Sequence, residues 1–298
     1  MRKSTHIRAG SNLRLTHKVE PYLFLLPALF FAVAFTYYPF FETIVNSFFK
    51  LNVHAQRTTF IGFKNYASVL NNTNFKNAFW NSLRFTFMTV PFNILISLTL
   101  AMLAERKQRF HHIYEVLFSL PMAISMSAAC MIFKLLLNNS IGLFNYTFGL
   151  DIAWFFDRLY AMPGLAAITV WMSLGYEFLF LNAALRNMPQ DILEAAKVDG
   201  ARWHQRTLRI VLPLISPTLF YLACLDIVTN MMMAGPALVL TNGGPRKSTE
   251  TLVFHMYQQT VSSTSMGYGY AVSIIIFLVV FLMIMLTFRF EKKGVFYS

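Results

Sequence analysis

Apolar residues in this chain gather in long runs, and most polar residues lie between the runs. A helix needs about 20 mostly apolar residues to cross the hydrocarbon core of a bilayer. Helices are the natural spanning element because they satisfy their own backbone hydrogen bonds. The pattern predicts an all-α integral membrane protein with six transmembrane helices. The six runs are Pro21–Phe41, Phe85–Ala104, Val116–Phe133, Ala161–Leu185, Leu212–Leu240 and Tyr268–Phe288.

The composition agrees with this pattern. Of the 298 residues, 56% are hydrophobic and only 13% are charged, whereas soluble domains usually carry about 25% charged residues. The formal net charge is +12. Lys and Arg lie between the apolar runs rather than on one amphipathic face, so we expect membrane lipid and no nucleic acid as a partner.

The distribution of Lys and Arg predicts the orientation. Cytoplasmic segments of membrane proteins carry an excess of these residues. An N-in/C-in arrangement places most of the 25 Lys and Arg residues in the cytoplasm. It also places the polar segment between the fourth and fifth runs there.

The chain therefore divides into membrane-embedded and soluble parts. We expect the long outer loop to fold as short helices on the surface. The predicted parts are a cytoplasmic tail at 1–20, a first transmembrane helix at 21–41, an extracytoplasmic loop at 42–82, a core of five transmembrane helices at 83–289 that includes a polar cytoplasmic loop at 187–213, and a cytoplasmic tail at 290–298.

The polar loop has the features of a compact helix-turn-helix. Pro189 suits the first turn of a helix, and Glu194 lies near that helix's N-terminus, where the helix dipole favours negative charge. Ala195 and Ala196 let another surface approach closely. Gly200 fits a left-handed cap that ends the helix. An ordinary amphipathic cytoplasmic loop is the alternative interpretation of these residue types.

The spacing within this loop resembles that of a known family. Glu194-Ala-Ala-Lys-Val-Asp-Gly200, followed by Ile210-Val-Leu-Pro213, is similar to the EAA loop of ABC importer permeases. That pattern is Glu-Ala-Ala, three residues, Gly, nine residues and Ile-x-Leu-Pro. One departure is Thr207, where relatives usually have Phe.

The resemblance extends from about Lys18 to the end of the chain. Thr241-Asn-Gly-Gly-Pro245 and Thr249-Glu-Thr-Leu252 resemble the signature of carbohydrate-type permeases. The chain is most similar to the first permease subunit of sugar and glycerol-3-phosphate importers. This implies the transmembrane domain of a type I ABC importer in a bacterial inner membrane.

The resemblance also implies a division of labour. An ATPase would dock on the EAA loop, so force would pass through Glu194, Ala195, Ala196, Asp199 and Gly200. Expected partners are a second homologous permease, two ABC ATPase subunits and an extracytoplasmic solute-binding protein. The chain has no Gly-x-x-x-x-Gly-Lys-Ser/Thr motif for cradling phosphates. We therefore expect no enzyme activity and no cofactor here, with ATP and Mg bound by the partner ATPases.

Ionisable residues inside membrane spans are costly and mark candidate pathways. Glu177 and Asp226 interrupt the fourth and fifth runs, and Asn230 follows Asp226 by one turn. Relatives often have a neutral amide where Glu177 stands. These residues either bind solute hydroxyls or make contacts between helices and subunits. Tyr176 and Tyr221 either stack on a sugar ring or serve as packing and interface anchors.

Three other functions remain open on sequence grounds. The first is an ABC permease for a non-carbohydrate solute, which a panel of uptake substrates would identify. The second is an intramembrane lipid-modifying enzyme, which needs a polar catalytic cluster at the membrane surface. The third is a stand-alone ion-coupled transporter, which needs inverted repeats and paired broken helices.

Overall fold

The chain folds into an elongated bundle of helices. A computed structural model describes residues 12–52, 54–105, 111–261 and 265–295. Within these residues, four helices are long and apolar enough to cross a membrane, and two bent helix pairs raise the number to six if each pair is one span. The prediction of a mostly helical membrane protein is confirmed, and the count of six stays a prediction.

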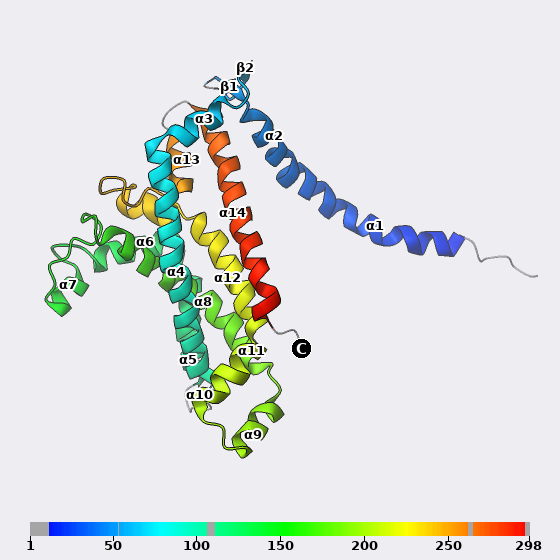
Figure 1. The fold of residues 1–298 in the computed structure, drawn as a ribbon, viewed down its shortest axis with the longest axis vertical. Helices are drawn as coiled ribbons and strands as arrows, with labels where there is room; N and C mark the ends of the chain where they lie inside the picture. Colours follow the sequence, from blue (N-terminus) through cyan, green and yellow to red (C-terminus); the bar gives the residue numbers. More distant parts are fainter. Residues whose placement is uncertain (1–11, 53, 106–110, 262–264, 296–298) are drawn as a thin grey trace, which may run out of the picture.

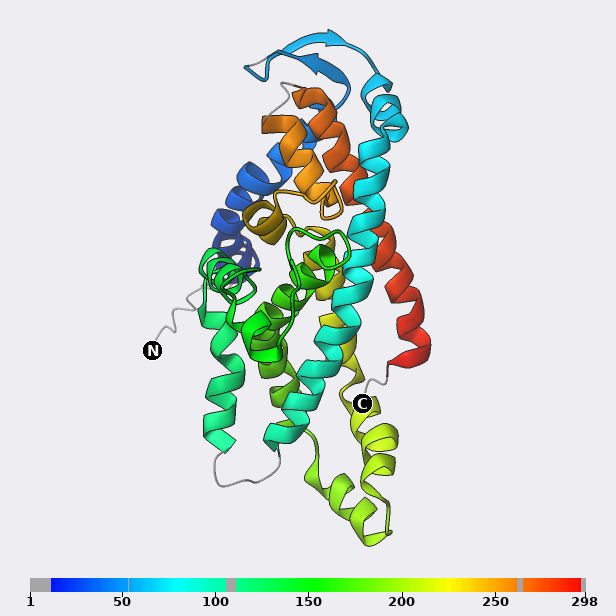
Figure 2. The same ribbon diagram turned by 90° about the vertical axis from the view of Figure 1, so that its left-hand side faces the viewer.

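The two ends of the bundle differ in structure. A two-stranded hairpin of β1 (Phe49–Leu51) and β2 (Arg57–Phe60) lies at one end. Helices α9 (Gln190–Val198) and α10 (Trp203–Arg206) lie at the opposite end (Figure 1). Figure 2 shows α4 (Thr73–Glu105), in cyan to teal, running between them. At 1.5 Å per residue α4 is about 50 Å long, and the hydrocarbon core is about 30 Å thick. Helix α4 is longer than a span requires, and it begins at Thr73, well before the expected Phe85.

Two spans agree with the sequence to within a few residues. Helix α8 (Ala161–Arg186) matches the fourth run. Helix α14 (Met266–Gly294) matches the sixth run and continues beyond Phe288. Both runs are mostly apolar over more than 20 residues, which is the pattern that most directly specifies a spanning helix.

The first span stands apart from the rest of the bundle. It consists of α1 (Asn12–Ala32), a π-helical turn and α2 (Tyr38–Asn46). None of its most apolar window is buried inside the chain, and Figure 1 shows α1 running away from the bundle. Its last part, α2, packs on α14, where the Phe40 and Phe277 rings lie 5.1 Å apart. Of the expected tail at 1–20, residues 1–11 lie outside the described part.

The third run is not one straight helix. Helix α5 (His111–Ser119) and helix α6 (Met126–Leu136) meet at an angle of 102°. A 3₁₀ turn that contains Pro121 separates them. The Ser125 side chain then accepts a hydrogen bond from the Ala128 N–H and starts α6. The expectation of one continuous helix at Val116–Phe133 is wrong because the proline and the new N-cap interrupt it.

The fifth run is also broken. Helix α10, a π-helical turn and α11 (Leu212–Leu214) meet helix α12 (Ser216–Met231) at 68°. Pro213 lies before the bend and Pro217 in the first turn after it. Helix α12 ends at Met231, so the expected single span Leu212–Leu240 is too long.

The outer loop contains strands that the sequence did not predict. Strands β1 and β2 pair antiparallel, and the Phe49 and Phe60 rings lie 5.3 Å apart. The Asn65 side chain donates a hydrogen bond of 2.8 Å to the Ser47 carbonyl. The expected short helices are present in part. Further helices in the described part are α3 (Lys64–Asn71), α7 (Leu143–Phe148), a π-helical turn at Ala237–Thr241 and α13 (Leu252–Val261).

Candidate functional site

A knob formed by residues 190–206 projects from the end of the bundle (Figure 1). Pro189 has an extended backbone and directly precedes α9, so it is the N-cap residue rather than part of the expected first turn. Gly200 has a φ of +75°. The Gly200 N–H bonds the Lys197 carbonyl at 3.1 Å, and the Ala201 N–H bonds the Ala196 carbonyl at 3.0 Å. This is a Schellman motif, and the predicted left-handed cap is confirmed.

The knob presents one face to the outside and anchors the other. Ala196 is buried, and the partly buried Leu193 packs against the core cluster of α8 and α12. Glu194 and Ala195 are exposed, and Val198 is 87% exposed. The knob is therefore a rigid projection with a small apolar and acidic surface. Asp199 and Gly200 are also exposed, at the turn.

A second group of polar residues is buried where α4, α8 and α12 meet. We call it the carboxyl cluster, and it consists of Asn93, Ser97, Glu177, Asp226 and Asn230. Asn93 Nδ2 donates to Asp226 Oδ2 at 3.2 Å. Glu177 interacts electrostatically with Asp226. The structure thus brings together three predicted residues from two helices, and adds two from α4.

An aromatic surface adjoins this cluster. The Tyr176 and Tyr221 hydroxyls lie 3.2 Å apart. The ring of Phe180 is 4.7 Å from the Tyr176 ring and 5.7 Å from the Tyr221 ring. Tyr176 interacts electrostatically with both Glu177 and Asp226. Because Tyr221 and Phe180 are exposed, the aromatic group links the buried carboxyl groups to the molecular surface.

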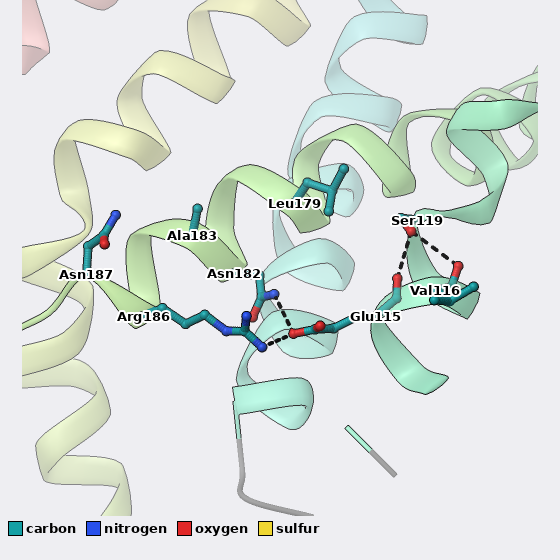
Figure 3. A pocket seen from close by; sticks show the side chains of 8 residues that line it. All are labelled: Glu115, Val116, Ser119, Leu179, Asn182, Ala183, Arg186 and Asn187. Atoms are coloured by element: carbon teal, nitrogen blue, oxygen red, sulfur yellow. Dashed lines mark hydrogen bonds and ion pairs between the residues drawn. The ribbon is translucent and has the colours of Figure 1, made fainter. Parts of the chain in front are cut away.

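A polar pocket of about 440 Å³ lies between α5 and α8 (Figure 3). Glu115 accepts a hydrogen bond of 3.2 Å from Asn182 Nδ2 and pairs with Arg186. Figure 3 shows both α8 side chains pointing toward Glu115. This ion pair ties the α5 segment to the helix that leads into the knob. The sequence singled out neither Glu115 nor Arg186 as a site residue.

The segment that resembles the carbohydrate-permease signature forms a buried network. Glu250 Oε1 lies 2.7 Å from His255 Nδ1, and His255 Nε2 lies 3.2 Å from the Tyr268 hydroxyl. The Thr249 hydroxyl bonds the Gly244 carbonyl at 2.7 Å. These residues hold the loop onto α4 and α14, so their observed contacts are structural.

The sequence contained a signal for the two cluster residues of α4, which were not among the predicted site residues. Asn93 and Ser97 are four residues apart in an otherwise apolar stretch of α4, and side chains with this spacing lie on one face of a helix. The sequence pattern of α4 does not indicate which neighbouring helices this face would contact.

Three comparisons connect this architecture to known proteins. The model of the family described as "Binding-protein-dependent transport system inner membrane component" matches residues 93–293. The sn-glycerol-3-phosphate transport system permease protein UgpA of Brucella abortus is 32% identical, over 95% of this chain and 98% of its own. UgpA of Escherichia coli is 30% identical, over 93% and 96%.

Solved structures show the same fold. A chain of a bacterial ABC transporter involved in the import of the acidic polysaccharide alginate has a TM-score of 0.81 and 19% identity, covering 94% of this chain and 99% of its own. A chain of the MetNI methionine ABC transporter has a TM-score of 0.56 and 15% identity, covering 73% and 94%.

Proposed function

Because this chain belongs to the family of inner membrane components of binding-protein-dependent transport systems, we propose that it is the permease subunit of an ATP-driven importer for a sugar, a polyol or a glycerol phosphate. Members of this family are transport subunits of ABC systems, so the chain is an inner-membrane permease and not an enzyme. The relatives named for sn-glycerol-3-phosphate transport support this range of solutes.

The knob is the observation that carries the proposal. In this proposal Glu194, Ala195, Ala196, Asp199 and Gly200 receive force from an ATPase and do no covalent chemistry. Its exposed face includes small, apolar and acidic side chains, and its inner face is packed against the bundle. ATP and Mg would be bound by two ATPase subunits, with no cofactor in this chain. Closure of the ATPases would move the knob as a rigid body.

The remaining assembly follows from the same proposal. Six spans in an N-in/C-in orientation would place the knob in the cytoplasm and the β1–β2 hairpin outside, which the opposite ends of Figure 1 support. The core at 83–289 would pair with a second permease. A solute-binding protein would deliver solute at the outer end. Solute would pass Glu177, Asp226, Asn230, Tyr176 and Tyr221.

A cross-linking experiment tests the proposal. Val198 on the knob and Tyr146 on α7 are both 87% exposed, so Val198→Cys and Tyr146→Cys form a matched pair in a background without Cys130 and Cys224. We expect Val198→Cys to cross-link to an ATPase subunit and Tyr146→Cys not to. Failure to recover an ATPase, or labelling of Val198→Cys from outside intact cells by an impermeant maleimide, refutes the proposal.

A further inference from the structure

The unpaired atoms of the carboxyl cluster are all oxygens. Asn93 Oδ1, Ser97 Oγ, both carboxylate oxygens of Glu177 and Asn230 Oδ1 are buried and make no hydrogen bond of 3.5 Å or less among the described residues. Ser97 and Asp226 are the polar neighbours of the Glu177 carboxyl group. A buried polar atom without a partner is costly and calls for an explanation. Amide and carboxylate oxygens accept hydrogen bonds. The cluster therefore has spare acceptors and suits an occupant that brings hydrogen-bond donors.

Each amide nitrogen of the cluster already makes one hydrogen bond. Asn93 Nδ2 donates to the Asp226 carboxylate at 3.2 Å, and Asn230 Nδ2 donates to the Asp226 backbone carbonyl at 2.8 Å. An ionised phosphate group has strong acceptor oxygens. The amides and the Ser97 hydroxyl of the cluster would offer it only uncharged donors. A hydroxyl group both donates and accepts, so it matches the unpaired oxygens.

The three helices that form the cluster have no Lys or Arg close to it. Helix α12 contains no Lys or Arg. On α4, Arg84 precedes Asn93 by nine residues, and on α8, Arg186 follows Glu177 by nine residues. Nine residues of helix rise about 14 Å, and Arg186 already pairs with Glu115. An anion at the cluster would therefore have no cationic partner on these helices, and burying an unpaired charge is costly.

The adjoining aromatic surface fits the same class of solute. Tyr176, Phe180 and Tyr221 present rings and two hydroxyls beside the carboxyl groups. Binding sites for small molecules combine apolar or aromatic walls with a few placed polar groups. A sugar or polyol has C–H surfaces for the rings and hydroxyls for the oxygens.

We propose that the carboxyl cluster selects neutral polyhydroxylated solutes, sugars or polyols, and rejects phosphate esters. This inference rests on the proposed permease function and narrows its solute. It distinguishes this chain from its relatives named for sn-glycerol-3-phosphate transport and from the structural neighbour involved in alginate import. Asn93 and Ser97 become selectivity residues together with Glu177 and Asp226.

Uptake by the complete transporter in proteoliposomes, with its own binding protein, tests the proposal. The probes are labelled maltose, sucrose, trehalose, glucitol and glycerol as neutral solutes, and sn-glycerol 3-phosphate and glucose 1-phosphate as anions. We expect at least one neutral solute to enter about tenfold faster than either anion, a ratio that corresponds to 1.4 kcal/mol. Faster ATP-dependent uptake of either phosphate ester overturns the inference and leaves the importer function standing.

Charge-neutralising variants separate selectivity from folding. Glu177→Gln and Asp226→Asn keep the side-chain shape and remove the charge, so the neutral-to-anion uptake ratio should fall about tenfold. Glu42→Gln is the control because Glu42 is an acidic residue outside the cluster, and it should leave the ratio unchanged. Equal loss of both classes of solute indicates a structural role and overturns the inference. No ATP-dependent uptake of any probe, with no ATPase in the purified complex, overturns the permease function itself.

Discussion

Replacing Gly200 by Val should weaken the knob without creating a clash. Gly200 has a φ of +75°, and a Cβ added there would meet no heavy atom within 4 Å. The cost is therefore backbone strain, because an L-residue in the left-handed region loses about 1–2 kcal/mol. A loss of about 2 kcal/mol lowers the ratio of formed to open cap by a factor of about 30. The two Schellman hydrogen bonds would open with it.

The assay compares three variants in the purified complex. We expect Gly200→Val to lose bound ATPase subunits or ATP-driven uptake. Gly200→Asn should lose much less, because Asn tolerates the left-handed region. Gly149 is the matched control: it caps α7 with a φ of +60°, and an added Cβ there also meets nothing within 4 Å. Gly149→Val should carry similar strain and leave coupling intact.

Two results would refute this reasoning. The first is Gly200→Val complex that keeps its ATPase subunits and its uptake rate. The second is equal damage from Gly149→Val, which would show that strain anywhere in the chain, rather than loss of the knob, disables the transporter.

Three further substitutions test other parts of the structure. Asp226→Ala should lower uptake about tenfold, because it removes a charge-assisted hydrogen-bonding group, while assembly measured by co-purification is unchanged; a normal uptake rate would remove Asp226 from the pathway. Gly175→Ala should destabilise the subunit by about 2 kcal/mol in thermal unfolding, since its Cβ would lie 2.8 Å from backbone atoms around the turn Leu120–Ala123; an unchanged melting temperature contradicts this packing. His255→Ala should cost about 2 kcal/mol in the same assay, because it removes the Glu250 partner at 2.7 Å and leaves the buried carboxyl group with the Lys247 ammonium at 3.9 Å; the exposed His54→Ala is the control.

The sequence was informative where one local pattern decides the structure. Helices α8 and α14 follow from long, mostly apolar runs, and the cap at Gly200 follows from the need for a positive φ. The third run failed because its apolar composition hides a change of direction. Pro121 and Ser125 were the only local signs of the break, and a proline inside a membrane helix is often tolerated, as Pro91 in α4 shows.

The candidate pathway was only partly predictable for a different reason. Glu177 and Asp226 stood out because charge is rare inside a span. Their contact with Asn93 joins residues 133 positions apart, and no periodicity within α4 indicates which helix its polar face meets. The same holds for Glu115 and Arg186, whose pairing depends on the bend between α5 and α6.

The packing explains how a force on the knob could reach the carboxyl cluster. Leu193 on α9 packs against the core cluster that contains Phe178 and Leu181 of α8 and Leu222 of α12. Glu177 precedes Phe178 directly, and Asp226 follows Leu222 by one helical turn. Close-packed interiors transmit displacement because they deform little. A rigid movement of α9 should therefore shift α8 relative to α12 and change the spacing of the two carboxyl groups. Packed side chains that have two discrete arrangements carry coupling between distant sites. A disulfide that fixes α8 to α12 should consequently block uptake while leaving ATPase binding to the knob intact, and uptake that persists in the cross-linked complex would show that the force travels by another route.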